Sequence, residues 1–325
     1  MLEILKVTFP FFALVLGGYV VVRARFMPLE AITGLNTFVL YLALPCMLFR
    51  FGVSTPVARL FDPAVAAVWL PTVLLMVGGC IALSLNDRIR WNDAAFGALV
   101  TTFPNTGFLG VPLLVALLGP RVAGPMIATV LIDLVVTSSL CIALSRIDGA
   151  GQGGASAAAR RALRGVAINP LPWAILGGGL ASWLGLEPVR PVAATIGLLA
   201  DSASPVALFS IGAVLARSRM LALSAVQAPL RWRDYLPLSL AKLFIHPLLV
   251  YGIGRAGIAL GLPLDPFALV AITLVAALPS ASNVAVVAER FGADTGRIVR
   301  IILVTTVAAF LTLSTAVALL APTVA

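Results

Sequence analysis

Two short runs of polar and helix-breaking residues interrupt long apolar stretches in this sequence of 325 residues. Residues 101–112 contain three threonines, two glycines, two prolines and an asparagine, and residues 278–283 read Leu-Pro-Ser-Ala-Ser-Asn. A proline removes a backbone donor and disfavours helical geometry at the preceding residue, so each run predicts a helix that stops and restarts. The candidate binding residues in the two runs are Pro104, Asn105, Thr106, Pro279, Ser282 and Asn283.

A helix that restarts inside an apolar segment offers chemistry suited to an anion. Its first N–H groups and its positive dipole end face the gap, which favours a negatively charged group. The amides of Asn105 and Asn283 can donate to a carboxylate or accept from an amide or a metal ion. The pattern therefore predicts a site for a small organic anion. Two structural alternatives stay open: the asparagines could cap the restarted helices, and each proline could form an ordinary membrane-helix kink.

Four ionisable residues lie deep within apolar stretches: Asp133, Asp201, Lys242 and His246. A charge at the centre of a bilayer costs roughly 2.5–3.5 kcal/mol, so these side chains are expected to face the protein interior and to be paired or hydrated. Lys242 is predicted to anchor the anion and Asp133 to exchange a coupling proton or sodium ion, with Asp201 and His246 as further coupling candidates. The structural alternatives are a register-fixing Lys–Asp pair, a helix cap at Asp201, and a packing or kink role for His246 before Pro247.

Composition indicates that these residues are positioned by membrane-spanning helices. A chain that is 61% hydrophobic and 11% charged, with a mean hydropathy of +1.08, is not a soluble protein. The net charge of +9 does not indicate nucleic-acid binding, because the cations are scattered between apolar runs. The predicted fold class is an all-α polytopic membrane protein with ten transmembrane helices, since segments of roughly 20 residues are long enough to cross the bilayer. They lie approximately at residues 5–22, 32–51, 64–85, 94–118, 122–145, 167–186, 191–216, 235–260, 266–288 and 298–320.

A glycine-rich linker at residues 147–165 divides the chain into two halves of five spans, residues 1–146 and 166–325. The loops on the linker's side of the membrane hold 15 Lys and Arg residues and the other side holds 6, which places the linker in the cytoplasm and both termini outside. The predicted location is the plasma (inner) membrane. With five spans each, the two halves must have inverted topologies.

Three matches between the halves support an inverted repeat. Spans two and seven share PxxLFxxG, at residues 45–52 and 205–212. Spans three and eight share a Leu-Pro pair, at positions 70–71 and 236–237. Spans four and nine share the pattern LVxxxP, at positions 99–104 and 274–279. The interrupted spans four and nine therefore occupy corresponding places in the two halves, which is typical of a secondary transporter's binding site.

These motifs resemble the bacterial members of the auxin efflux carrier family, which includes malonate carriers. The resemblance covers essentially the whole chain, and its most specific parts are FPNTGFLGVPL in span four and LPSASNVAVVAERFGAD in span nine. It implies a fold similar to the bile acid:sodium symporters, in which spans one, two, six and seven form a scaffold and the other spans form a moving core with crossing broken helices. It further implies elevator-type transport of a small carboxylate or dicarboxylate, paired crossover asparagines at Asn105 and Asn283, and a homodimer through the scaffold as one arrangement.

Other functions receive less support from the sequence. No GxGD context for an aspartyl protease surrounds Asp133 or Asp201, no phosphate-binding loop is present, and the single His246 has no partners for a serine hydrolase. Three cysteines without a CxxC pair indicate no metal site. We therefore expect no enzyme activity and no cofactor other than sodium or a proton as the coupling ion, with the lipid bilayer and the anion as partners. The alternatives are a sodium-coupled symporter of a bulkier, bile-acid-like anion and a membrane receptor or channel.

Overall fold

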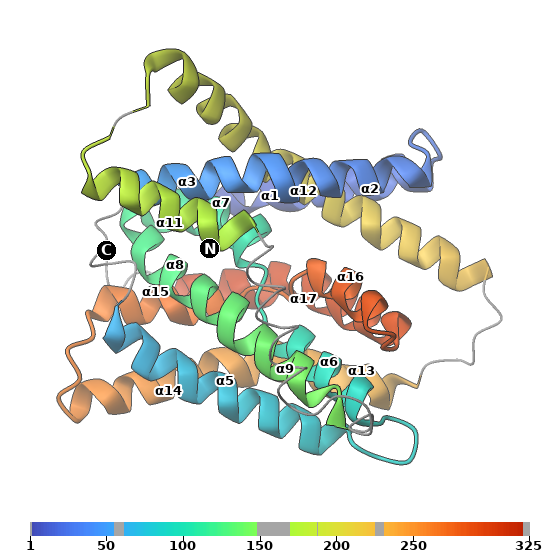
Figure 1. The fold of residues 1–325 in the computed structure, drawn as a ribbon. Coiled ribbons are helices and arrows are strands. Elements are labelled where there is room, and N and C mark those ends of the chain that lie inside the picture. Colours follow the sequence, from blue (N-terminus) through green and yellow to red (C-terminus); the bar gives the residue numbers. More distant parts are fainter. Residues whose placement is uncertain (1, 55–61, 148–169, 187, 225–230, 321–325) are drawn as a thin grey trace. The chain divides into compact units, whose positions relative to one another are not determined.

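The computed structural model describes residues 2–54, 62–147, 170–186, 188–224 and 231–320, and this part of the chain is built from helices (Figure 1). The predicted linker lies outside the described residues from residue 148 onward. The α-helices are α1 (Leu2–Arg23), α2 (Leu29–Phe38), α3 (Leu44–Ser54), α5 (Pro63–Ser84), α6 (Trp91–Thr102), α7 (Val111–Leu118), α8 (Ala123–Ile132), α9 (Ser138–Leu144), α11 (Pro170–Trp183), α12 (Arg190–Ser224), α13 (Trp232–Leu240), α14 (His246–Ala259), α15 (Pro266–Ala277), α16 (Asn283–Arg290) and α17 (Thr295–Leu320).

Six helical segments in the described part of the chain are long and apolar enough to cross a membrane. They are Leu29–Ser54, Pro63–Ser84, Pro120–Leu144, Arg190–Arg217, Trp232–Ala259 and Thr295–Leu320. The all-helical, multi-pass membrane class predicted from composition is therefore confirmed. The interrupted spans do not meet this length because α6 and α15 have 12 residues each.

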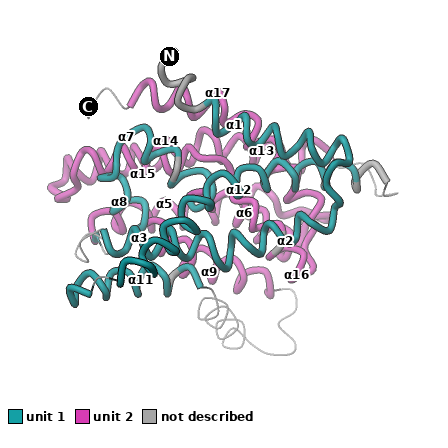
Figure 2. Tube along the Cα trace, turned by 90° about the horizontal axis from the view of Figure 1, so that it is seen from above, with its two compact units in different colours: residues 1–62, 107–128, 169–227 teal, residues 63–106, 129–168, 228–325 magenta. Residues whose placement is uncertain are grey.

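The chain forms two compact units, and each unit takes segments from both halves of the sequence (Figure 2). Unit 1 consists of Met1–Asp62, Gly107–Ala128 and Asn169–Gln227, and unit 2 consists of Pro63–Thr106, Thr129–Ile168 and Ala228–Ala325. The units are thus a different division of the chain from the two predicted repeats. Unit 1 contains the predicted scaffold spans one, two, six and seven, but it also contains residues 107–128, which the resemblance assigns to the core.

Glycine pairs bring the helices of unit 1 close together. A Cβ atom on Gly212 of α12 would lie 1.8 Å from the Val15 carbonyl oxygen of α1, and one on Gly18 of α1 would lie 1.9 Å from the Phe209 carbonyl oxygen of α12. Gly52 of α3 has the same role against α11, because its Cβ would lie 2.4 Å from the Ile175 carbonyl oxygen. Small residues of this kind let membrane helices pack backbone to backbone. The glycine that ends each copy of PxxLFxxG is therefore a packing residue.

The core of unit 2 contains the two broken helices, since residues 94–102 of α6 and 268–277 of α15 are all buried. Arg297 of α17 is also buried, and its guanidinium donates to the carbonyl oxygens of Asp93 and Asp234 and to the Ser84 hydroxyl at 2.7–3.0 Å. This side chain joins one end of four helices: α5, α6, α13 and α17. Residue 297 falls between the predicted spans 266–288 and 298–320 and was therefore counted among the loop cations, but the structure places Arg297 inside α17 with a buried side chain.

Candidate functional site: the crossover of α6 and α15

Both predicted interruptions are observed, and both occur directly before a proline. α6 ends at Thr102, and Phe103 then has an extended backbone with φ −83° and ψ 106°. α15 ends at Ala277, and Leu278 is extended with φ −60° and ψ 152°. The residue before a proline is driven away from helical geometry by contact with the proline ring. The interruptions follow from local sequence.

The two extended segments pair with each other. Pro104 and Ser280 form an isolated antiparallel bridge. The Asn105 N–H donates to the Pro279 carbonyl oxygen at 2.8 Å, and the Ala281 N–H donates to the Phe103 carbonyl oxygen at 3.0 Å. Backbone groups without a helical partner are costly in a membrane interior. The segments satisfy each other's backbone and thereby form a fixed crossover within unit 2.

Several buried side-chain atoms at the crossover have no hydrogen-bond partner in the described part of the chain. The candidate binding residues among them are Asn105 and Asn283 through Oδ1, and Thr106 through Oγ1. Buried polar atoms in folded proteins nearly always have a partner, so a cluster of free ones marks a place for a ligand or water. Further free hydroxyls in the two paired segments and next to them belong to Ser280 and Thr102.

The structure does not support the capping alternative for the two asparagines. α16 begins at Asn283, and its N-cap Ser282 makes no side-chain capping bond. The Asn105 and Asn283 Oδ1 atoms accept no hydrogen bond in the described residues. Ser282 and Pro279 therefore shape the backbone between α15 and α16, whereas both amides are free for another partner.

A second polar cluster in unit 2 contains three of the four deep ionisable residues. The Asp133 Oδ1 atom accepts from the Trp69 indole N–H at 3.0 Å and from the Thr137 hydroxyl at 2.8 Å, whereas its Oδ2 has no partner in the described part of the chain. Lys242 Nζ lies 2.9 Å from His246 Nδ1. The His246 ring packs against Trp69 at 5.4 Å between ring centroids. Trp69 thus connects Asp133 to the Lys242–His246 pair.

Asp133 and Lys242 do not form a direct ion pair in the described structure, so the register-fixing salt bridge considered from the sequence is not present. Both residues lie instead in π-helical turns, Asp133–Thr137 and Ala241–Ile245. A third π-helical turn, Thr106–Gly110, follows the crossover. Such turns shift the helix register by one residue and are frequent at functional sites.

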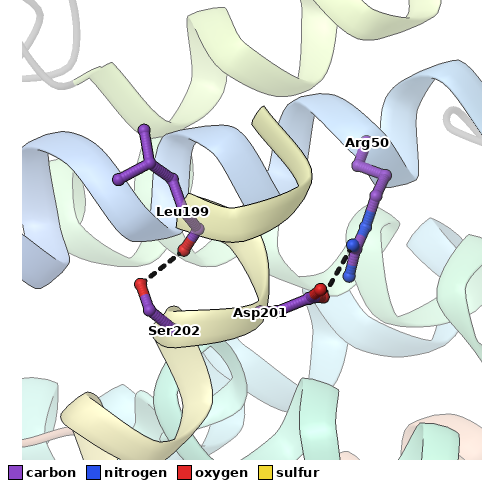
Figure 3. Close-up of polar contacts among 4 residues, drawn as sticks. All are labelled: Arg50, Leu199, Asp201 and Ser202. Atoms are coloured by element: carbon purple, nitrogen blue, oxygen red, sulfur yellow. Dashed lines mark hydrogen bonds and ion pairs between the residues drawn. The ribbon is translucent and has the colours of Figure 1, made fainter. Parts of the chain in front are cut away.

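Asp201 is not part of this cluster. It lies in unit 1, inside the continuous helix α12, so the structural alternative that it caps a helix does not hold. Its carboxylate is exposed and points toward Arg50 of α3, whose Nη1 lies 2.7 Å from Oδ1 (Figure 3). The next residue, Ser202, donates back to the Leu199 carbonyl oxygen within α12 at 2.7 Å. Arg50 lies near the end of the predicted span 32–51, and the structure shows it to be a helical residue of α3 that pairs with Asp201.

Sequence reasoning missed several residues of these clusters. Trp69 holds Asp133, and its indole N–H, which needs a partner when buried, was the available signal. Thr305 of α17 accepts the Ser280 N–H at 3.2 Å through its hydroxyl oxygen. Nothing in the local sequence around Thr305 distinguishes it from other membrane threonines. Thr137 was also missed, although it lies one helical turn after Asp133.

A family model for membrane transport proteins matches residues 3–154 and 155–317, which together are nearly the whole chain. The boundary between the two matched segments falls in the glycine-rich linker. With two broken helices that cross inside one compact unit, the chain is a membrane transport protein by family. It belongs to the auxin efflux carrier family, and the resemblance identified from the motifs is thereby confirmed.

Relatives with similar sequences come from bacteria and plants. The chain is 30% identical over 308 residues to the "Putative malonate transporter" of Rhizobium meliloti, covering 94% of this chain and 92% of that protein. It is 27% identical over 296 residues to the "Uncharacterized transporter YfdV" of Escherichia coli K12, covering 88% of each. It is 30% identical over 121 residues to "Auxin efflux carrier component 4" of Arabidopsis thaliana, covering 36% of this chain and 19% of that protein.

Proposed function

We propose that this protein is a secondary transporter of a small organic anion, a carboxylate or dicarboxylate of the malonate class, and that the crossover of α6 and α15 binds the anion. The observation that carries the proposal is the group of buried side-chain atoms at the crossover that lack partners in the described residues, above all Oδ1 of Asn105 and of Asn283. An amide group flipped about its last side-chain bond presents its two N–H donors in place of the oxygen, so both residues can donate to a carboxylate. The name of the Rhizobium relative supports the dicarboxylate class.

The remaining ligands come from the surrounding backbone and hydroxyls. Thr106 begins the π-helical turn after the crossover, and its free hydroxyl can donate to the anion. The amino end of α16 starts at Asn283 and adds partial positive charge. Pro104 and Pro279 keep the backbone extended at the residue before each of them, so that the two helices stay interrupted here. Ser282 directly precedes α16.

The proposed architecture is that of ten spans in two inverted repeats, in the inner membrane, with the linker in the cytoplasm and both termini outside. Its support is the repeat pattern, the distribution of Lys and Arg, and the matching interruptions of α6 and α15. An elevator-type mechanism would carry the anion with unit 2, which contains the complete crossover. A homodimer is compatible with this proposal.

Asp133 is the proposed coupling residue, with either a proton or sodium as the ion. Its Oδ2 atom is buried and free in the described structure, whereas the Asp201 carboxylate is paired with Arg50 in the other unit. In the Asp133→Asn variant we expect transport to lose the parent's dependence on the driving ion, because the amide keeps the size and loses the charge. Retention of the parent's dependence on both sodium and pH would assign a structural role to Asp133.

Counterflow in liposomes, with a panel of mono- and dicarboxylates under imposed sodium or proton gradients, tests the transport function. Asn105→Ala and Asn283→Ala are expected to weaken anion binding by about 1–3 kcal/mol, the range for a hydrogen bond to a charged group. Asn92→Ala is the matched control, because Asn92 lies at the other end of α6 and donates to the Phe291 carbonyl oxygen. If the parent protein binds none of the anions, or if both crossover variants bind like the control, the proposed site is wrong.

A further inference from the structure

One backbone carbonyl at the end of α15 loses its helical partner at the crossover. In a continuous helix the Ala276 carbonyl oxygen would accept from the N–H of Ser280, four residues later. Ser280 instead donates its N–H to the Thr305 hydroxyl oxygen at 3.2 Å. Pro279, which lies between them, has no N–H to offer. The Ala276 carbonyl therefore needs a donor from elsewhere.

Lys242 supplies that donor. Its Nζ atom lies 2.9 Å from the Ala276 carbonyl oxygen, and its side chain is fully buried. The carboxyl end of a helix carries partial negative charge, which favours a cation at this position. His246 lies one turn later, and its Nδ1 contacts the same Nζ at 2.9 Å. The lysine is thus held between its own helix and the end of α15.

We propose that Lys242 is a positioning residue, which caps the end of α15 and thereby holds the crossover segment of residues 278–282 in its extended geometry. This role replaces the direct anion contact expected from the sequence. The Nζ atom is engaged by Ala276 and His246, whereas the Asn105 amide oxygen has no partner in the described residues. The anion binds to the crossover groups that have no partner. Lys242 affects anion binding indirectly, because it holds the backbone at the end of α15.

Hydrogen–deuterium exchange of the ligand-free, full-length protein in nanodiscs tests this role directly. In Lys242→Gln we expect the peptide covering residues 278–284 to exchange about tenfold faster, as for the loss of one hydrogen bond of about 1.4 kcal/mol. Exchange in α12 of unit 1 is expected to stay unchanged. The matched control is Ser239→Ala, which removes a buried hydroxyl that donates to the Tyr235 carbonyl oxygen one turn before Lys242. This control should leave residues 278–284 protected.

A second variant removes the other side-chain contact that holds residues 278–282. Thr305→Val removes the acceptor of the Ser280 N–H and is expected to give the same local acceleration without changing Lys242. If Lys242→Gln does not yield folded protein, Lys242→Arg keeps a donor but displaces it, and residues 278–284 should again exchange faster than in the parent. Exchange equal to that of the parent in the folded Lys242 variant overturns the proposal.

Binding measurements separate positioning from direct contact, and only this arm rests on the proposed function. A positioning residue predicts that Lys242→Gln weakens malonate and its half-amide, malonamate, by similar factors of about ten. A direct charge contact predicts a loss for the dianion at least about tenfold larger than the loss for the monoanion. That second result would overturn the proposal. If the parent binds neither compound, the transport proposal fails while the exchange experiment still decides the role of Lys242.

Discussion

The two broken helices of unit 2 end in similar backbone geometry but are held in different ways. After α6 and after α15 the chain turns extended before a proline, and the two extended segments pair through Pro104 and Ser280. At the end of α15, Lys242 binds the Ala276 carbonyl oxygen and Thr305 binds the Ser280 N–H. Two side chains from other helices thus fix this junction.

The end of α6 has no such lysine. When the two halves are aligned on their shared Leu-Pro pairs, Leu70-Pro71 and Leu236-Pro237, the counterpart of Lys242 is Met76, which is buried and has no N–H or O–H donor. The side chains that follow this junction, Asn105 and Thr106, keep free polar atoms in the described structure. The comparison indicates that side chains of other helices fix the junction after α15, whereas both sides of the crossover, through Asn105 and Asn283, offer free groups to a ligand.

The largest expected effect comes from placing a lysine in the first junction. Met76→Lys buries a cation at a position where the parent protein has a buried apolar side chain, and a buried charge without a partner destabilises by about 3–5 kcal/mol. We expect this variant to be largely unfolded after mild heating in detergent, measured by the fraction that remains monodisperse in size-exclusion chromatography. Met76→Leu is the control and should behave like the parent. A stable Met76→Lys protein would show that the two junctions are equivalent.

The sequence predicted where the two helices are interrupted, but not which residues contact each other at the interruptions. Pro104 and Pro279 act on the residue directly before them, so the breaks in α6 and α15 could be located from sequence alone. The pairing of Asn105 with Pro279 joins positions far apart in the chain and depends on how the helices pack. Likewise, the reach of Lys242 to Ala276 depends on the π-helical turn Ala241–Ile245, which no composition signal marks.

For the ionisable residues deep in the apolar stretches, the sequence likewise predicted burial but not contact partners. Burial of Asp133 followed from the cost of a charge in the membrane, and the structure confirms that this side chain is buried. The same argument predicted that Asp201 faces the protein interior, although the structure shows its carboxylate exposed and paired with Arg50. The free-energy cost of burying a charge applies to each residue separately and does not identify the residue with which the charge pairs. The ion pair of Asp201 with Arg50 required the packing of α3 against α12.

An intermediate effect is expected when the two prolines are replaced in turn. Pro104→Ala restores an N–H that can bind the Val100 carbonyl oxygen, so α6 can extend and pull Asn105 away from Pro279. We expect anion binding to weaken about tenfold, or ~1.4 kcal/mol. Pro279→Ala should weaken it by only about threefold, because Lys242 and Thr305 still hold that junction. Isothermal titration of the purified variants checks the order, and a larger loss for Pro279→Ala would contradict the comparison.

The smallest effect is expected at Cys80 and His246, which are counterparts in the same alignment of the two halves. The Cys80 thiol is a weak hydrogen-bonding group, and the Thr101 hydroxyl in the last turn of α6 donates to the Gly97 carbonyl oxygen at 2.7 Å without it. Cys80→Ala should therefore change anion affinity by less than about 1.5-fold. His246 contacts Lys242 Nζ, so His246→Ala loosens the lysine and should weaken binding about threefold. Titrating both variants with the anion that the parent binds best measures the difference.

Both substitutions remove a buried side chain at corresponding positions of the two halves. Equal losses of affinity would therefore mean that His246 acts by packing alone. The asymmetry between the two junctions would then rest on Lys242 and Thr305.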